Sequence, residues 1–455
     1  MRVHFIAIGG SAMHNLAIAL KKKGYQVSGS DDVFYEPSKS RLKNHGLLPA
    51  TEGWDSSVIT EEIDAVILGM HAREDNPELL KAQELGLRIY SYPEYIYEQS
   101  KQKTRVVIGG SHGKTTITSM IMHVLKDRNQ DFDYLVGAQL EGFDTMVRIT
   151  DEAPVIIIEG DEYLASPIDR RPKFHLYKAN IAVLSGIAWD HINVFPTFDN
   201  YVEQFRMFLG TMTPGGTVIY SKDDEELQKI IDQTEAVLTK IPYTIPEYSV
   251  DKGVTNLLTY NGIVPLLIFG AHNLLNLSAA REVCKLLGIS EVDFYDSIKT
   301  FKGASRRLEL LGKNEETFVF KDFAHSPSKL EATVTAVKNQ FPDKQLVAVI
   351  ELHSFSSLNK DFLKEYSGTM NKADVSIVFI DEHTFKLKRI EPYNENVVKT
   401  SFGNAKLKFF NNAEILERFL LSINYKGKNL LLMSSGNFGG LNLENLKDRI
   451  LNKDV

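Results

Sequence analysis

The chain has 455 residues, of which 43% are hydrophobic and 24% are charged, and its formal net charge is −7. This length suggests about three domains, and the composition is that of an ordinary soluble globular protein that does not bind nucleic acid. The single cysteine, Cys284, excludes an internal disulfide framework and indicates a reducing, cytoplasmic location. It lies in an apolar helical run, which favours a core thiol over a nucleophile. No apolar run is long enough to span a membrane, and the N-terminus is typical of a strand rather than a signal peptide.

A strand–helix–strand pattern opens the chain. Residues 3–8 form an apolar run typical of a strand, residues 13–20 have helical periodicity, and residues 25–28 form a second strand. Asp31 follows about 20 residues after the first glycines, which is the spacing of a dinucleotide-binding fold, although the full G-x-G-x-x-G pattern is absent. Later strands in this region alternate with helices, which predicts a parallel sheet.

Parallel sheets bind ligands at the carboxyl ends of their strands. The residues at these ends in the first hundred positions are Gly9, Gly10, Ser11, Asp31 and His71. The alternative for each of them is a tight turn or a helix cap. We favour substrate binding for the glycines and Asp31, whereas the two interpretations of His71 are equally supported.

A glycine-rich loop between a strand and a helix begins a second α/β unit near Thr104. The β-branched strand at 106–108 leads into the loop, and the apolar spacing of residues 117–125 predicts an amphipathic helix. In such a loop, backbone N–H groups cradle phosphate, Lys114 neutralises its charge and a threonine hydroxyl can bind Mg²⁺. The general pattern G-x-x-x-x-G-K-[ST] requires glycine where this chain has Ile108, so the loop alone leaves an ordinary strand–turn–helix corner open.

Polar clusters follow the next two strands of this unit. Residues 154–158 form a continuous apolar run, which predicts a central strand. The carboxylates that follow it, and that suit a Mg²⁺ site, are Glu159, Asp161 and Glu162. A further strand at 181–184 leads to Asp190 and His191, which we expect at the same edge of the sheet.

Three polar side chains gather at the predicted start of a helix, and they are His272, Asn273 and Asn276. Asparagine at a helix start is often only a cap, but three such side chains exceed what capping requires. Arg306 and Arg307 follow near a predicted domain junction, where an arginine can reach a transferring phosphoryl group.

The last part of the chain again alternates strands and helices, and Asp322 and His325 follow the strand predicted at 317–320. We therefore expect an α/β protein of three domains. They are a Rossmann-like N-terminal domain at 1–103, a central P-loop ATPase-like domain with a parallel sheet at 104–302, and a Rossmann-like C-terminal domain at 303–455.

The motifs of this chain, in their order, resemble those of the Mur ligases, the ATP-dependent amide-bond formers of peptidoglycan synthesis. The resemblance covers nearly the whole length. It is carried by residues 110–116, 159–162, 190–191, 270–276, 301–309 and 322–327. In this family the loop is built as G-[ST]-x-G-K-[ST], so Ile108 is a strand residue and not a missing glycine.

The resemblance implies ATP and Mg²⁺ as cofactors and a role for each matching residue. ATP would be held by Gly110, Ser111, His112, Gly113, Lys114, Thr115, Thr116, His272, Asn273, Asn276, Arg307 and Asp322. Among these, Lys114 contacts the β- and γ-phosphates, Arg307 the γ-phosphate and Asp322 the ribose, and His272 and Asn273 lie by the adenine. Mg²⁺ would be held by Thr115, Glu159 and His191. The catalytic residues would be Lys114, His191, Arg307 and His325, while the first domain would bind a UDP-sugar.

The implied reaction joins the carboxylate of UDP-N-acetylmuramate to an amine. Residues 161–174 and 433–440 favour the branch that recycles the peptide L-alanyl-γ-D-glutamyl-meso-diaminopimelate, and the branch that adds L-alanine is the alternative. Arg206 stands where other branches carry a carbamylated lysine, and His353 stands where the recycling enzymes typically have arginine, so the third residue of the peptide is open. A nucleotide-binding module without catalysis is a further alternative. The implied partners are small molecules, without nucleic acid or membrane, for a monomer or a weak homodimer.

Overall fold

The computed structural model describes residues 1–189, 194–303 and 308–452. The chain divides into two compact units, which we describe separately. The first unit contains Met1–Trp189, Pro196–Thr244 and Ala279–Ser297, and the second is built mainly from Ile245–Ser278 and Ile298–Val455. No helix among the described residues is long and apolar enough to cross a membrane.

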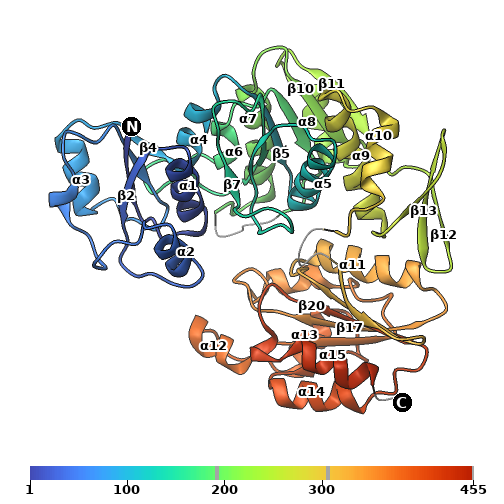
Figure 1. Ribbon diagram of the computed structural model, residues 1–455. Coiled ribbons are helices and arrows are strands. Elements are labelled where there is room, and N and C mark those ends of the chain that lie inside the picture. Colours follow the sequence, from blue (N-terminus) through green and yellow to red (C-terminus); the bar gives the residue numbers. More distant parts are fainter. Residues whose placement is uncertain (190–193, 304–307, 453–455) are drawn as a thin grey trace. The chain divides into compact units, whose positions relative to one another are not determined.

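The first unit opens with a four-stranded parallel sheet in the order β2-β1-β3-β4 (Figure 1). Its strands are β1 (Arg2–Ile6), β2 (Gln26–Ser30), β3 (Ala65–Leu68) and β4 (Ile89–Ser91). The helices between and after them are α1 (Ser11–Lys22), α2 (Ser38–Asn44), α3 (Pro77–Glu84) and α4 (Tyr92–Ser100). Local sequence sets where these helices start: the Asn76 side chain accepts the Glu78 and Leu79 N–H groups ahead of α3, and Ser91 and Glu94 form a capping box on α4.

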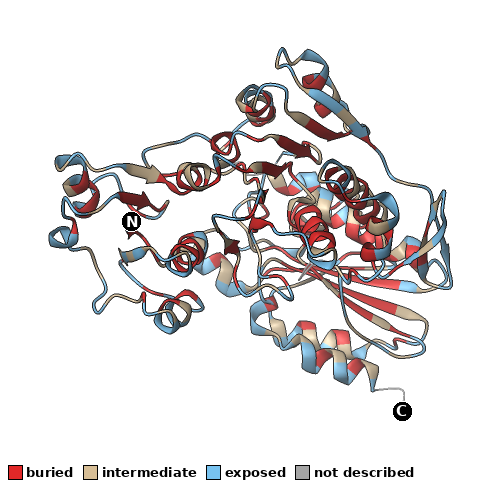
Figure 2. Ribbon diagram, turned by 45° about the horizontal axis from the view of Figure 1, so that its top comes forward, coloured by how far each residue is buried: buried red, intermediate tan, exposed pale blue. Residues whose placement is uncertain are grey.

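A seven-stranded sheet in the order β11-β10-β9-β5-β8-β6-β7 forms the rest of the first unit. Its strands are β5 (Thr104–Gly109), β6 (Asp133–Leu135), β7 (Val147–Arg148), β8 (Val155–Glu159), β9 (Ile181–Leu184), β10 (Thr217–Ser221) and β11 (Thr239–Tyr243). All neighbouring strands are parallel except β6 and β7. Residues 106–108 of β5 and 156–158 of β8 are almost fully buried, because both strands lie inside the sheet and are covered on both faces (Figure 2).

Helices cover this sheet and position its loops. They are α5 (Lys114–Asp127), α6 (Lys173–Leu176), α7 (Phe198–Thr211), α8 (Glu225–Gln233), α10 (Glu291–Ile298) and the part of α9 (Ala271–Leu286) from residue 279 onward. Residues 271–278 of α9 belong to the second unit. Cys284 on α9 is fully buried, as predicted, and burial raises the pKa of its thiol.

The second unit holds a six-stranded sheet in the order β15-β16-β20-β17-β18-β19, parallel except where β15 meets β16. Its strands are β15 (Glu309–Lys313), β16 (Phe318–Asp322), β17 (Gln345–Glu351), β18 (Val375–Phe379), β19 (Lys408–Phe410) and β20 (Lys428–Met433). Its helices are α11 (Pro327–Gln340), α12 (Glu382–Lys388), α13 (Glu395–Ser401), α14 (Ala413–Ser422) and α15 (Leu443–Leu451). Successive residues of β17 enter separate apolar cores on the two faces: Ala348 and Ile350 enter one, and Val347 and Val349 the other.

The predicted α/β class with parallel sheets is confirmed. An antiparallel three-stranded sheet, β12 (Tyr248–Asp251), β13 (Val254–Thr259) and β14 (Gly262–Leu266), was not predicted. The predicted domain boundaries at 103/104 and 302/303 stay predictions.

Candidate nucleotide-binding site

The loop between β5 and α5 lies at the centre of the seven-stranded sheet. Gly110 and Gly113 both have positive φ, +119° and +77°, which side-chain-bearing residues rarely adopt. A Cβ atom on Gly110 would lie 2.8 Å from the backbone nitrogen of Ser185, which follows β9. The tight loop therefore depends on glycine, and it opens the N-terminus of α5, where unpaired N–H groups and the helix dipole favour phosphate.

Lys114, the first residue of α5, reaches back over this loop. Its Nζ donates to the Gly110 carbonyl at 2.7 Å and to Glu162 Oε2 at 2.7 Å. Burial alone would lower the pKa of Lys114, but the carboxylates of Glu162, Asp161 and Glu159 outweigh it and hold the pKa above its ordinary value. Lys114 is therefore a fixed cation at the position where a phosphate would sit.

Thr115 and Glu159 form an oxygen pair beside the lysine. The Thr115 hydroxyl donates to Glu159 Oε1 at 2.8 Å, and Glu159 Oε2 accepts the Gly137 N–H at 2.8 Å. Two neighbouring ligands of an octahedral Mg²⁺ with bonds of about 2.1 Å lie about 3 Å apart, so this spacing fits that ion. Among the described residues no group of three or more His, Cys, Asp or Glu could hold a metal.

Asp161, which also follows β8, pairs with a lysine outside the loop. Asp161 Oδ2 accepts a hydrogen bond from Lys173 Nζ at 2.6 Å. Burial would raise the pKa of Asp161, but Lys173 and Lys114 together hold it below its usual range. Of the three predicted carboxylates, the structure therefore places Glu159 and Glu162 against the loop residues Thr115 and Lys114.

The remaining loop residues form hydrogen bonds with the segment that follows β9, the strand next to β5. The Ser111 N–H donates to the Gly186 carbonyl at 3.0 Å, and the His112 carbonyl accepts a hydrogen bond from the Ser185 hydroxyl. Thr116 is buried in the first turn of α5. Hydrogen bonds thus hold the loop against the segment that follows β9.

The candidate residues of the N-terminal sheet meet at one edge. Gly9 donates its N–H to Asp31 Oδ2 at 2.7 Å, because the parallel pairing of β1 with β2 brings their ends together. Desolvation by burial raises the pKa of Asp31 to about 6. Gly10 caps α1, Ser11 is exposed at its first position, and His71 is exposed beyond β3. The structure brings Gly9, Gly10, Ser11 and Asp31 together.

The second unit holds two groups of candidates. Asn273 donates to the Phe269 carbonyl at 2.9 Å, and a cavity of about 110 Å³ adjoins His272 between β12 and α11. Asn276 lies buried one turn further along α9. Asp322 ends β16 and accepts the N–H groups of Leu308 at 2.6 Å and Ala324 at 2.7 Å, so it organises the turn that carries His325.

Residues that bear on the choice of amine also lie together at the carboxyl end of the strands of the six-stranded sheet. Glu351 accepts the Phe438 N–H at 2.8 Å, and a Cβ atom on Gly436 would lie 3.1 Å from His353 Nε2. Burial lowers the pKa of His353. By contrast, Arg206 is half-exposed and pairs with Glu203 at 2.5 Å. Asp190, His191, Arg306 and Arg307 lie outside the described residues.

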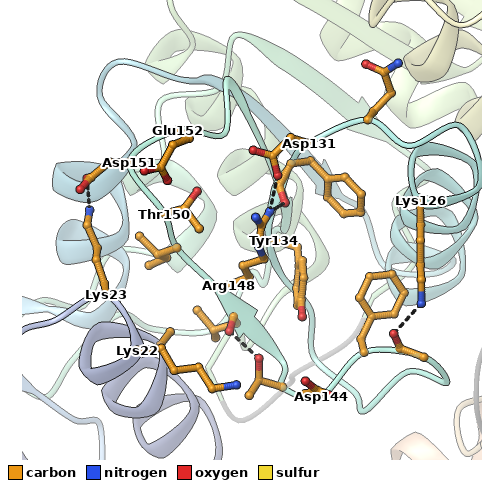
Figure 3. Close-up of a pocket in the computed structure, with 18 of the residues that line it drawn as sticks. Lys22, Lys23, Lys126, Asp131, Tyr134, Asp144, Arg148, Thr150, Asp151 and Glu152 are labelled. Atoms are coloured by element: carbon orange, nitrogen blue, oxygen red, sulfur yellow. Dashed lines mark hydrogen bonds and ion pairs between the residues drawn. The ribbon is translucent and has the colours of Figure 1, made fainter.

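Figure 3 shows a larger cavity, of about 820 Å³, and none of the loop residues 110–116 lines it. Its lining includes Lys22 and Lys23 at the C-terminal end of α1 and Lys126 at that of α5. Lys126 lies about 18 Å along the helix from Lys114 at 1.5 Å per residue. The size of a cavity is therefore a poor guide to the nucleotide site in this protein, and the loop geometry is a better one.

Family models match the chain in three consecutive parts. Residues 2–104 match "Mur ligase family, catalytic domain", residues 108–284 match "Mur ligase middle domain", and residues 306–436 match "Mur ligase, glutamate ligase domain".

Individual proteins agree with these models. The UDP-N-acetylmuramate–L-alanine ligase of Desulforamulus reducens is 30% identical over 392 residues, covering 83% of this chain and 82% of the relative. The solved UDP-N-acetylmuramate–alanine ligase of Thermotoga maritima has a TM-score of 0.68 at 20% identity, covering 100% of this chain and 99% of that one. The solved UDP-N-acetylmuramate:L-alanyl-γ-D-glutamyl-meso-diaminopimelate ligase of Neisseria meningitides has a TM-score of 0.60 at 25% identity, covering 67% of this chain and 99% of that one.

The fold and the family matches together define an ATP-using enzyme of the α/β class. The chain belongs to the Mur ligase family. It is thus an ATP-dependent ligase of peptidoglycan synthesis that forms amide bonds and uses ATP and Mg²⁺, as predicted. The roles of single residues stay predictions.

Proposed function

We propose that this enzyme joins the carboxylate of UDP-N-acetylmuramate to the α-amine of L-alanine. The observation that carries this proposal is the phosphate loop with its Lys114 and the Thr115–Glu159 oxygen pair, in a chain whose curated relatives are named as L-alanine ligases. The loop accounts for the use of ATP, and the relatives point to the amine. The relatives favour the branch that adds L-alanine, whereas residues 161–174 and 433–440 favour the branch that recycles the peptide.

The chemistry requires an activated carboxylate, because an amine that attacks a carboxylate directly would have to expel an oxide ion, which is a poor leaving group. The muramate carboxylate attacks the γ-phosphorus of ATP, so that ADP leaves and an acyl phosphate forms. The amine then attacks the acyl carbon, loses a proton, and inorganic phosphate departs. Lys114 would hold the transferring phosphoryl oxygens. Thr115 and Glu159 would hold Mg²⁺, which would neutralise charge on the β- and γ-phosphates.

The remaining residues would bind and orient the substrates. Gly9, Gly10, Ser11 and Asp31 would hold the UDP-sugar, since they lie together where the parallel strands β1 and β2 end. In the second unit, His272 and Asn273 would contact the adenine, Asp322 the ribose and His325 the reacting groups. His191 and Arg307 are assigned on the family motifs alone.

A peptide that begins with L-alanine is the second candidate for the amine. Residues 161–174 and 433–440 favour it, and the structure places the latter stretch beside Glu351 and His353 at the carboxyl end of β17. Both candidates present the same α-amine of an L-alanine residue, so they share the chemistry above and differ in what extends beyond it.

A panel of amines decides between the two candidates. Phosphate release from ATP would be measured with UDP-N-acetylmuramate and one amine at a time. The amines are free L-alanine, glycine, L-serine and L-alanyl-γ-D-glutamyl-meso-diaminopimelate. We expect the highest kcat/KM with free L-alanine. A preference for the tripeptide by more than about tenfold, or 1.4 kcal/mol of transition-state binding, would assign the enzyme to peptide recycling instead.

The variant Lys114→Ala is the control for this assay. It should release no phosphate above background with any amine. A non-catalytic nucleotide-binding module would release no phosphate in the wild-type protein either, whichever amine is supplied, and this outcome would refute the proposed activity.

A further inference from the structure

A chain of hydrogen bonds connects α7 to Lys114 through groups that the reaction scheme above does not use. The Ala188 N–H donates to Ser111 Oγ at 2.8 Å, and Ser111 Oγ lies 2.9 Å from the Tyr201 hydroxyl. Tyr201 donates to Glu162 Oε1 at 3.0 Å, and Glu162 Oε2 accepts from Lys114 Nζ at 2.7 Å. This series of hydrogen bonds thus links the segments that follow three adjacent strands, β9, β5 and β8.

The direction of each hydrogen bond follows from the chemistry of the two ends. An ammonium can only donate, so Glu162 meets Lys114 as a carboxylate, which can only accept. Tyr201 must therefore donate its one hydroxyl proton to Glu162, and it accepts the proton of Ser111. Ser111 in turn accepts from the Ala188 N–H. The chemistry of the groups thus assigns a donor and an acceptor to each of these hydrogen bonds.

Burial makes this arrangement costly to disturb. The side chain of Glu162 is 1% exposed and that of Lys114 is 16% exposed, and Tyr201 is fully buried. A buried carboxylate that loses a hydrogen-bond donor keeps its desolvation penalty without the compensation. Glu162 is consequently held in place by Tyr201 on one oxygen while the other oxygen holds Lys114.

The contacts of Lys114 leave room for a ligand. An ammonium has three N–H donors. In the structure, Lys114 donates one to the Gly110 carbonyl and one to Glu162. Lys114 can therefore keep both contacts and give its third N–H to a phosphate oxygen. This arrangement means that a phosphate need not displace Glu162.

We propose that Glu162 and Tyr201 are positioning residues of the nucleotide site: Glu162 fixes the Lys114 ammonium over the loop, and the Tyr201 hydroxyl, supported by Ser111, fixes Glu162. Neither residue touches the reacting atoms. Their contribution is to hold Lys114 where the transferring phosphoryl group will be, before ATP arrives. The inference depends on the ATP site of this family, but not on which amine the enzyme uses.

The variant Tyr201→Phe tests the hydroxyl and leaves the ring. The ring packs edge-on against Phe205, with centroids 5.2 Å apart, and phenylalanine retains that contact. We expect KM for ATP and the Kd for ADP·Mg²⁺ to rise about tenfold, as for loss of one hydrogen bond to a charged group. The KM values for UDP-N-acetylmuramate and for the amine should stay within about twofold, because only the nucleotide site is altered.

Tyr243→Phe is the matched control. Tyr243 is a buried tyrosine on β11 of the same sheet, and its hydroxyl has no hydrogen-bond partner among the described residues. This variant should change neither KM for ATP nor the Kd for ADP. It also shows how much thermal stability is lost or gained when a buried tyrosine hydroxyl of this sheet is removed without a positioning role.

A double-mutant cycle tests whether Tyr201 acts through Glu162. Glu162→Gln should weaken ADP·Mg²⁺ binding more than Tyr201→Phe does, because it removes the carboxylate charge that holds Lys114. The double variant Tyr201→Phe/Glu162→Gln should bind ADP no more weakly than Glu162→Gln alone, since residues in one network are not additive.

Three results would overturn the proposal. Tighter ADP binding in Glu162→Gln would show that Glu162 competes with phosphate for Lys114. Additive effects in the cycle would show that Tyr201 does not act through Glu162. Equal changes in all three KM values would show a general structural role. Because ADP binding needs no amine, these outcomes are independent of the amine panel.

Discussion

Asp31 illustrates what a single buried carboxylate does at the end of an edge strand. It accepts the Gly9 N–H at 2.7 Å, yet desolvation by burial outweighs this stabilisation and raises its pKa to about 6. The neighbouring carboxylate of Asp32 adds to the increase. The folded protein therefore retains a proton on Asp31 at a pH where the unfolded chain, with a pKa of 3.8, has already lost it.

The sign of the resulting pH dependence follows from this difference. The protonated carboxyl contributes stability that is fully present below about pH 4 and is lost as the pH rises through about 6. Asp31→Asn, whose amide oxygen can still accept from Gly9, should remove this contribution. We expect the free energy of unfolding of the wild type, measured by thermal unfolding at each pH, to fall relative to that of the variant between pH 4.5 and 7, by on the order of 1 kcal/mol. A difference between the two proteins that is constant with pH would contradict this assignment.

The loop between β5 and α5 shows how a backbone element imposes a residue type. Gly110→Ala would place a Cβ atom 2.8 Å from the Ser185 nitrogen at a φ of +119°. Since the contact is with backbone, it cannot be relieved by a side-chain rotation. We expect a loss of about 1–3 kcal/mol in stability and of most phosphate release, measured by thermal unfolding and by the ligase assay.

Gly210→Ala is the control for that substitution. Gly210 lies in α7, where an added Cβ would meet no atom within 4 Å. Alanine in a helix is favoured over glycine by about 0.5–1 kcal/mol, so this variant should be slightly more stable and fully active. If Gly110→Ala behaves in the same way, the loop does not require glycine.

Elements with a strong local pattern could be predicted from the sequence. Buried β-branched runs predicted β5, β8 and β9 to within a residue or two. The sheet of β12, β13 and β14 was missed, because β12 is exposed along its whole length and has no apolar run. A strand whose stability comes from pairing rather than burial carries little local signal.

The candidate site was predictable to the same extent. Lys114, Thr115 and Glu159 lie in or directly after a glycine loop and a buried strand, which is a local pattern, and the structure brings them together. Tyr201 was not predicted, since its partner Glu162 is 39 residues away and its own spacing on α7 is that of a core residue. The contact between Tyr201 and Glu162 depends on which strands are neighbours in the sheet, and the local sequence does not contain that information.

At the scale of the whole molecule, the candidate residues divide between the two compact units. The first unit contains both the Gly9–Asp31 edge and the loop with Lys114, whereas the second contains His272, Asp322 and His325. Within the first unit the two candidate sites lie on separate sheets. A ligand for one site should therefore leave a local signature that is distinguishable from that of the other.

Amide hydrogen exchange can separate these signatures. UDP-N-acetylmuramate alone should slow exchange at residues 7–12 and 29–34, because the sugar nucleotide would cover the ends of β1 and β2. ADP with Mg²⁺ should instead slow exchange at 110–116 and near Gly137, where the loop N–H groups would bind phosphate and Glu159 would bind the ion. Lys114→Ala should lose the second pattern and keep the first. Protection of 110–116 by UDP-N-acetylmuramate without any change at 7–12 would contradict the assignment of the two sites.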